Sequence, residues 1–174
     1  MLSLKIVPVT LNHLGQLQRL SVTTFKETFA DQNTIDDIQQ YLKVNMSSNK
    51  LKKELSNPNC EFYFAYCNKI LGGYLKLNFK NAQREDVLEN KGFEIERIYL
   101  LKSFQGKGFG KKLFHKIIDI GRSKGYKKLW LGVWENNKSA IKFYEKFNLK
   151  IFDKHIFILG SDIQTDFLMK LTFN

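Results

Sequence analysis

Three glycines at alternate positions form a loop whose backbone could bind a ligand. Gly106, Gly108 and Gly110 lie in Gln-Gly-Lys-Gly-Phe-Gly, between an apolar strand-like run and a long amphipathic run. Glycine has no Cβ, so the backbone can turn tightly and a ligand can approach its N–H groups. A helix that begins in such a loop directs unpaired amides and its positive dipole end at one point. We therefore predict a phosphate or pyrophosphate site, to which Lys107 and Lys111 add charge.

The spacing of the glycines separates three kinds of phosphate loop. A dinucleotide loop, Gly-x-Gly-x-x-Gly, would place its third glycine one residue after Gly110, and a P-loop needs four residues between its glycines, followed by Lys-Ser or Lys-Thr. Three residues lie between Gly106 and Gly110, and two lysines follow them. The pattern that remains is Gln105-x-x-Gly108-x-Gly110. A strand, a turn and a helix that bind no ligand would give the same pattern.

Around this loop the chain alternates between strand-like and helix-like periodicity. The predicted elements are a strand at 2–8 that ends at Pro8, helices capped by Thr10 and Thr34, a short helix at 50–55, strands at 61–67 and 70–79, a polar loop at 80–92, a strand at 93–100, a helix after the glycine loop, a strand at 128–134, a helix after a polar turn at 135–139, and a hairpin of 151–159 with 164–172. Because a helix separates strand 93–100 from strand 128–134, these two should be parallel neighbours with a right-handed crossover.

A second pattern, Asn137-x-x-Ala140 followed by Tyr144, comes one strand after the glycine loop. The two patterns, in this order, resemble the signatures of the GCN5-related N-acetyltransferase (GNAT) family. The resemblance implies that 1–174 is a single domain with the GNAT fold. That fold is α/β: its central mixed sheet is mostly antiparallel, contains one splayed parallel pair, and is flanked by helices.

Several further stretches are similar to the PaiA-type polyamine acetyltransferases of this family, which act on spermidine and spermine. They are 24–29 (Thr-Phe-Lys-Glu-Thr-Phe), 53–57, 94–99, 130–135 and 164–166. Two departures are small: Asn148-Leu149 replaces the common Gly-Phe, and Lys102 stands where many members have proline. This likeness implies a polyamine as the acceptor of the acetyl group.

The family resemblance implies acetyl-CoA as cosubstrate and no metal. Its pantetheine arm would bond the main chain of the first parallel strand, which requires the splay because a fully paired strand has no spare N–H or C=O. The residues assigned to the cosubstrate in this way are Ile98, Tyr99, Leu100, Gln105, Gly106, Lys107, Gly108, Phe109, Gly110, Lys111, Asn137, Ala140, Tyr144 and Lys146. Asn137 is also a good helix N-cap, and Lys146 is equally a solvated helix lysine.

The same resemblance gives Tyr144 the role of general acid, since a phenol can protonate the departing CoA thiolate. The other interpretation of Tyr144 is an aromatic that packs against Phe143 and Phe147. A base must also take a proton from the acceptor amine. Glu94 and Glu96 share a strand face, and we favour Glu96, with a pKa raised by burial or with waters that pass the proton along. An exposed strand-end carboxylate, or a partner for the adjacent arginine, is an equal alternative.

A polycationic acceptor needs carboxylates that survive screening by salt. The family forms its acceptor pocket from the first two helices and the final hairpin, so Glu27, Asp31 and Glu54 are the predicted substrate residues. Asp162 and Asp166, near the hairpin, are second choices.

The chain carries a net charge of +11, yet its lysines are scattered rather than gathered in one tract. We therefore expect a solvated basic surface and no specific nucleic-acid partner. There is no signal-peptide pattern and no apolar run of membrane-spanning length, and Cys60 and Cys67 should be free thiols, so we expect a cytoplasmic monomer or homodimer with no membrane partner. Three alternatives stay open: a protein N-acetyltransferase acting on an N-terminal or lysine amine, a transcriptional regulator, and an acetyl-CoA sensor without turnover.

Overall fold

The computed structural model describes residues 3–85, 87–89 and 91–173. Its helices and strands are β1 (Leu4–Pro8), α1 (Leu14–Phe29), α2 (Ile35–Asn45), α3 (Ser48–Leu55), β2 (Cys60–Cys67), β3 (Ile70–Asn78), β4 (Phe93–Leu100), α4 (Phe109–Ser123), β5 (Lys128–Trp134), α5 (Lys138–Glu145), β6 (Lys150–Leu159) and β7 (Asp162–Thr172). Every predicted element is present, but Thr10 precedes a 3₁₀ turn, Leu11–His13, and α1 begins only after it, with His13 as its N-cap. Leu2 of the first predicted strand and positions 86 and 90 of the predicted loop lie outside the described residues. Within these ranges, no helix is both long and apolar enough to cross a bilayer.

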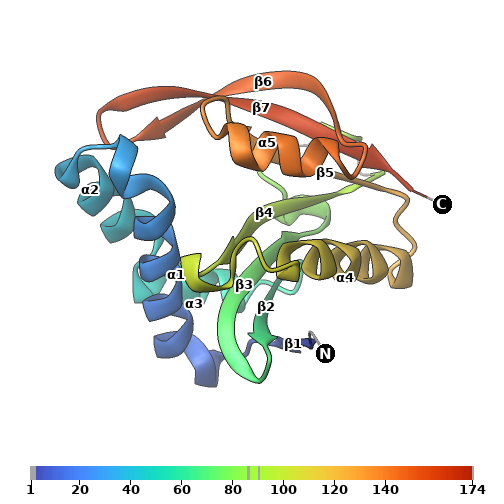
Figure 1. Ribbon diagram of the computed structural model, residues 1–174, viewed down its shortest axis with the longest axis horizontal. Coiled ribbons are helices and arrows are strands. Elements are labelled where there is room, and N and C mark those ends of the chain that lie inside the picture. Colours follow the sequence, from blue (N-terminus) through green and yellow to red (C-terminus); the bar gives the residue numbers. More distant parts are fainter. Residues whose placement is uncertain (1–2, 86, 90, 174) are drawn as a thin grey trace.

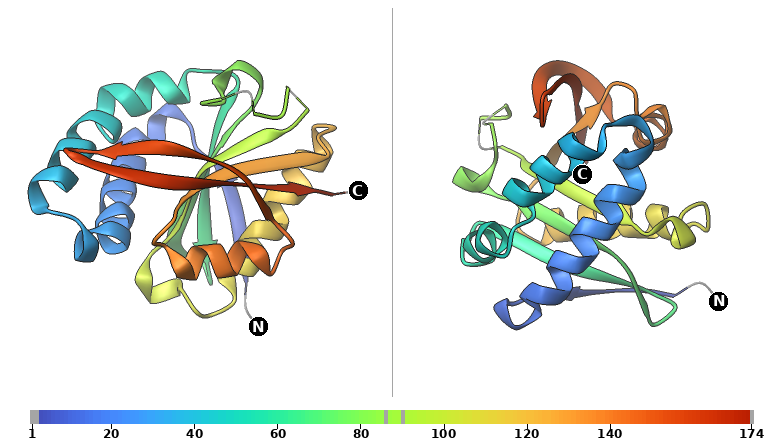
Figure 2. Two further views of the ribbon diagram at one scale, coloured as in Figure 1. Left: turned by 90° about the horizontal axis from the view of Figure 1, so that it is seen from above. Right: turned by 90° about the vertical axis from the view of Figure 1, so that its left-hand side faces the viewer.

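The strands form one mixed sheet in the order β1-β2-β3-β4-β5-β7-β6 (Figure 1). All neighbours are antiparallel except β4 and β5, which are parallel and joined through α4, as predicted. The hairpin of β6 and β7 extends beyond the rest of the sheet toward α2 (Figures 1 and 2).

Helices cover both faces of the sheet (Figure 2). On one face Leu113 and Ile117 of α4 pack on Leu75 and Ile95 of the central strands. On the other face, residues of α1 and α3, among them Leu17, pack on β2 and β3. Burying these apolar faces removes them from water, which is the main favourable contribution to folding. The sheet is therefore held rigid on both sides, except where β4 and β5 separate.

That separation begins two residues into the parallel pair. The pairing of β4 with β5 consists of Phe93 opposite Leu129 and Glu94 opposite Trp130. Beyond it, the edge of β4 that faces β5 has no strand partner among the described residues, so its N–H and C=O groups are open to a ligand, apart from the Leu100 carbonyl, which accepts from Gln105. The expected splay is thus confirmed.

The tip of the β6–β7 hairpin is attached to the start of α2. Thr34 caps α2, as predicted, by accepting the N–H of Asp37. Asp37 in turn accepts the N–H of Ser161 at 2.6 Å. A Cβ on Gly160 would lie 2.2 Å from the Asp37 carboxylate, so only glycine allows this approach. These contacts fix the hairpin over the open end of the sheet.

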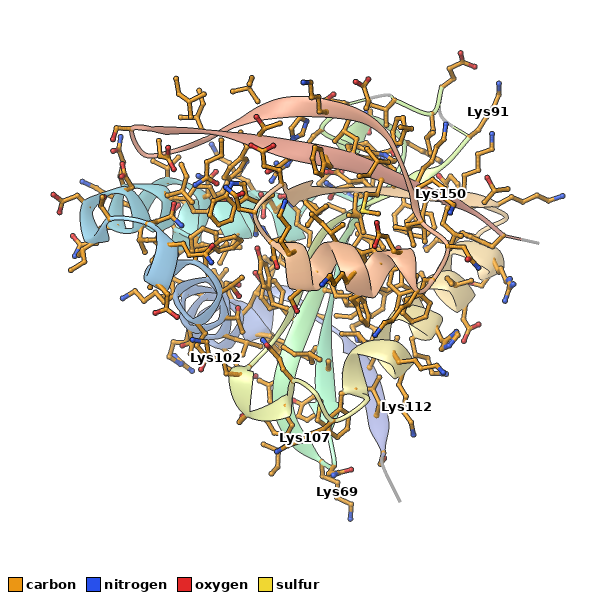
Figure 3. All side chains as sticks on the ribbon, turned by 45° about the horizontal axis from the view of Figure 1, so that its top comes forward. Lys69, Lys91, Lys102, Lys107, Lys112 and Lys150 are labelled. Carbon is orange, nitrogen blue, oxygen red and sulfur yellow. The ribbon has the colours of Figure 1, made fainter. Side chains whose placement is uncertain are left out.

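The positive charge is distributed over the whole molecule. Lysines at well-separated places include Lys69, Lys91, Lys102, Lys107, Lys112 and Lys150 (Figure 3). They belong to the β2–β3 turn, the loop before β4, the glycine loop and its flanks, and β6.

Candidate active site

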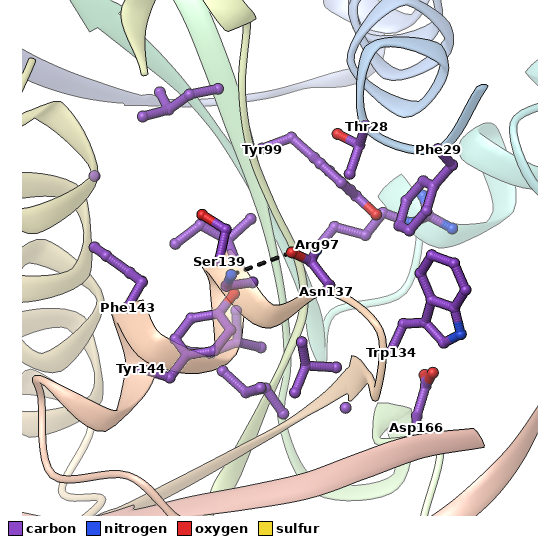
Figure 4. Close-up of a pocket in the computed structure, with 18 of the residues that line it drawn as sticks. Thr28, Phe29, Arg97, Tyr99, Trp134, Asn137, Ser139, Phe143, Tyr144 and Asp166 are labelled. Carbon is purple, nitrogen blue, oxygen red and sulfur yellow. Dashed lines mark hydrogen bonds between the residues drawn. The ribbon is translucent and has the colours of Figure 1, made fainter. Parts of the chain in front are cut away.

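The splay between β4 and β5 opens into a cavity of about 1050 Å³. Its walls come from β4, β5, the glycine loop, the end of α1, α5 and the β6–β7 hairpin. Figure 4 shows side chains from these elements converging on it, among them Tyr99, Asn137, Tyr144 and Asp166. The cavity therefore joins the glycine loop to the space under the hairpin.

The glycine loop has the backbone geometry that its sequence predicts. Gly108 is the N-cap of α4, and φ is 69° at Gly106 and 82° at Gly108, values that side chains disfavour. The Gln105 amide donates to the Leu100 carbonyl at 2.8 Å and ties the loop to the end of β4. The first amides of α4 consequently face the cavity end where β4 stops, which suits a pyrophosphate.

Most of the residues predicted for the cosubstrate line this cavity, and two do not. Lys107 is exposed and lies away from the wall, while the Phe109 ring is buried beside Phe104, so both offer only main-chain groups. The members that line the cavity are Ile98, Tyr99, Leu100, Gln105, Gly106, Gly108, Gly110, Lys111, Asn137, Ala140, Tyr144 and Lys146.

Asn137 and Tyr144 stand at the two ends of α5. The Asn137 Oδ1 accepts the N–H of Ala140 at 3.1 Å and caps the helix (Figure 4). This bond uses one lone pair of Oδ1, so the second lone pair and the two N–H groups of Nδ2 can bond a ligand. The Tyr144 ring packs against Phe114 and Phe143, and burial raises the pKa of its phenol. Tyr144 is therefore both a packing residue and a protonated donor on the cavity wall.

Glu96 has surroundings that differ from those expected. It accepts from the Asn78 amide at 2.6 Å and pairs with Lys76 at 2.5 Å, Arg97 at 3.3 Å and Arg84 at 3.5 Å. Burial alone would raise its pKa, but these three cations together outweigh burial and lower the pKa. The prediction of a burial-raised pKa at Glu96 is wrong, because three cations reach it from β3, β4 and the loop before β4. The alternative of a partner for the adjacent arginine is confirmed.

The three predicted substrate carboxylates do not share one pocket. Glu27 and Asp31 line the rim of the cavity, where they bind the main-chain N–H and the side chain of Lys102, respectively. Glu54 instead lines a separate cavity of about 380 Å³ and is paired with Lys76 at 2.8 Å and Arg97 at 3.3 Å. Glu54 is thus already neutralised, a consequence of contacts that no local pattern shows.

Other side chains that line the cavity near the β6–β7 hairpin carry no local sequence signal. They include Arg84, Arg97, Trp134, His155 and Phe157. Arg84 comes from the loop at 80–92, where Gln83 also bonds the indole of Trp130 at 2.7 Å. Asp166, a second choice in the sequence, lies on the same wall (Figure 4). The acidic part of the site therefore comes from β4 and β7 more than from the first two helices.

Comparison with known proteins identifies the family. The model of the acetyltransferase (GNAT) family matches residues 16–149, which include the glycine loop, the splayed strands and α5. The chain belongs to the GNAT family. It is an N-acetyltransferase, and its cavity fits acetyl-CoA: positive-φ glycines at a helix start, an unpaired strand edge and a protonated phenol lie along one channel.

Named relatives agree with this assignment. An uncharacterized N-acetyltransferase from the pepI 3′ region of Lactobacillus delbrueckii subsp. lactis is 44% identical over 170 residues, which is 98% of both chains. The spermine/spermidine N(1)-acetyltransferase of Bacillus subtilis (strain 168) is 32% identical over 57 residues, 32% of this chain and 38% of that protein. Among solved structures, the PaiA N-acetyltransferase of Thermoplasma acidophilum in complex with coenzyme A has a TM-score of 0.79 at 24% identity, covering 98% of this chain and 99% of that one. This GNAT chain thus shares its whole fold with a coenzyme A complex.

Proposed function

We propose that this enzyme transfers the acetyl group of acetyl-CoA to a primary amine of a polyamine such as spermidine or spermine. The observation that carries the proposal is the division of charge along one cavity. Lys111, Lys138 and Lys146 line the end near the glycine loop and α5, where phosphates of CoA would lie. The carboxylates of Glu94, Glu96 and Asp166 line the other end.

The acceptor end also offers aromatic surface. Tyr41, Trp134 and Phe157 belong to its wall, and aromatic faces attract cations. The names of the relatives add support, since one is a spermine/spermidine acetyltransferase and one a PaiA protein. Arg84 and Arg97 lie among the carboxylates and are paired with them, so they cancel part of the negative charge without reversing it.

In the proposed reaction the amine attacks the thioester carbonyl carbon, the C–S bond breaks, and the Tyr144 phenol donates its proton to the departing thiolate. Because burial raises the pKa of Tyr144, the phenol holds that proton at neutral pH until the thiolate forms. Glu96 enters as a fixed negative charge that orders waters and ammonium groups, since its ion pairs lower its pKa. A role in proton transfer through water stays a prediction for Glu96.

Release of free CoA thiol from acetyl-CoA tests the function. We expect turnover with spermidine or spermine to exceed a blank without acceptor and a panel of putrescine and lysine-bearing peptides. Turnover with peptides alone would contradict the polyamine assignment and favour a protein amine as acceptor. No turnover at all, with acetyl-CoA still bound, would contradict catalysis and favour a sensor.

Replacing Gly108 by alanine should weaken acetyl-CoA binding. Alanine in the left-handed region costs about 1–2 kcal/mol, so relaxation of the loop should raise the Kd for acetyl-CoA by roughly fivefold to thirtyfold. Gly125 gives a matched control, since it has the same φ of 82° at the other end of α4 and a Cβ there would meet nothing within 4 Å. Gly125→Ala should lower the melting temperature similarly and leave the Kd unchanged. Equal Kd values in the two variants would contradict a phosphate site at the loop.

A further inference from the structure

Asp166 is a carboxylate on the cavity wall whose bonds are incomplete. It lies on β7 opposite Trp134 of β5 and His155 of β6, and it is 9% exposed. Its Oδ1 is buried and has no hydrogen-bond partner among the described residues. A buried carboxylate oxygen without a donor is costly. Because Oδ1 is closed off from solvent, an acceptor amine in the cavity would meet the carboxylate at its other oxygen, Oδ2 (Figure 4).

The other oxygen of Asp166 faces a chain of titratable groups that leads outward. Its Oδ2 lies 3.6 Å from Nε2 of His155, and Nδ1 of His155 lies 2.5 Å from Oε1 of Glu85. The exposed fraction of the side chain rises along the chain, from 13% at Asp166 to 18% at His155 and 43% at Glu85. A Cβ on Gly132 would be 3.4 Å from the Asp166 carboxylate and 3.6 Å from the imidazole, so glycine leaves room beside the pair.

We propose that Asp166 is the general base that takes the proton from the acceptor ammonium, and that His155 and Glu85 pass this proton to solvent. The inference rests on the proposed function and completes it. An N–H bond of the ammonium breaks and an O–H bond forms at Oδ2 of Asp166, the oxygen that faces His155. The freed lone pair attacks the thioester carbon. Nε2 of His155 then accepts this proton from Asp166 while Nδ1–H gives one to Glu85, which passes it to water. The second proton that the attacking nitrogen loses restores the Tyr144 phenol, so each turnover releases one proton to water.

The other carboxylates on this wall are less suited to that step. Glu94 accepts through its Oε2 from the Asn78 amide and from the main-chain N–H of Arg84, each at 2.9 Å, and its Oε1 lies 3.8 Å from the Arg84 guanidinium. Glu96 is held by three cations. Donors and cations that favour the ionised form make a carboxylate a weaker proton acceptor. Asp166 instead contacts a titratable group, His155, at 3.6 Å.

The charged groups around Asp166 preserve its basicity. Burial raises its pKa, which His155 on β6 and Arg84 in the loop before β4 partly offset. Glu85 in that loop and Glu94 and Glu96 on β4 add negative charge around the same space. A raised pKa brings a carboxylate nearer to the operating pH, where a general base is most effective.

The test is the pH dependence of kcat/KM for the best polyamine found in the CoA-release assay, measured for wild type and Asp166→Asn. Without the base, only amine already deprotonated in solution reacts, and its fraction rises about tenfold per pH unit below a pKa near 10. We expect kcat/KM of Asp166→Asn at pH 7 to be lower than that of wild type by about a hundredfold or more. The ratio of wild type to variant should then shrink as pH rises, whereas a purely structural loss would be constant with pH.

Asp153→Asn is the matched control, because Asp153 is an exposed aspartate of the same hairpin and the charge change is identical. It should behave as wild type. His155→Gln should lower kcat and leave the Kd for acetyl-CoA unchanged, as expected for a positioning residue. An unchanged pH profile in Asp166→Asn would overturn the proposal, and so would a rise in KM alone, which would make Asp166 a binding group. If wild type itself turns over no amine, the proposed function fails before this comparison is made.

Discussion

Tyr144→Phe is expected to lower kcat by about a hundredfold or more while the Kd for acetyl-CoA stays nearly constant. The phenol O–H acts on the sulfur only as the C–S bond breaks, so its loss destabilises the transition state more than the bound state. Phenylalanine retains the ring that packs against Phe114 and Phe143, so the fold should be preserved. Steady-state kinetics with the best acceptor, together with titration of acetyl-CoA, measure the two quantities.

Tyr63→Phe is a suitable control for that variant. Its hydroxyl also donates to a partner, Glu61, at 2.6 Å, but it lies on β2 and does not line the cavity. Its kcat should equal that of wild type. An unchanged kcat in Tyr144→Phe would remove Tyr144 from the role of general acid and leave it as a packing residue of α5.

Glu96→Gln is expected to destabilise the fold by about 3 kcal/mol, near the lower end of what breaking a buried ion pair costs. The carboxylate is 7% exposed and faces Lys76, Arg84 and Arg97, so removing its charge leaves those cations less well compensated. The remaining partner of Lys76 and Arg97 is Glu54, which keeps the loss at the lower end. For a chain of this length, the melting temperature should fall by roughly 6–12 °C.

The size of that loss should depend on pH. The pKa of Glu96 is lowered in the folded protein, so its contribution is complete above the pKa of a carboxyl in the unfolded chain. The contribution is lost as pH falls from there toward the folded pKa. Denaturation experiments at neutral and acidic pH should therefore show that the free energies of unfolding of wild type and Glu96→Gln converge at low pH.

A surface ion pair provides the comparison for Glu96. Glu89 and Lys91 are 2.9 Å apart with exposed fractions of 82% and 66%, and solvent screens such pairs. Glu89→Gln should leave the melting temperature unchanged. If Glu96→Gln also left the melting temperature unchanged, the ion pairs of Glu96 would contribute nothing to stability.

The order and type of the elements were predictable because the signals are local. The aromatic and apolar composition of β2 and β3, the caps at Thr34 and Asn137, and the glycines before α4 each act within a few residues. The glycine loop and α5 likewise carry their motifs in contiguous residues, so the cosubstrate half of the site was visible before the structure. The splay also followed, since a cosubstrate strand must keep unpaired groups.

The sequence by itself determined the family, the fold and the residues predicted for the cosubstrate, whereas the tertiary structure decided which charged groups meet in the rest of the cavity. The sequence shows which residues are carboxylates, but it does not show which groups they contact. Glu54 meets Arg97 across 43 positions, and His155 meets Glu85 across 70. Which carboxylate is neutralised and which keeps a free oxygen depends on contacts between elements that only folding brings together. For this reason Glu54 and Glu96 are paired in the structure, and Asp166 keeps the unbonded oxygen.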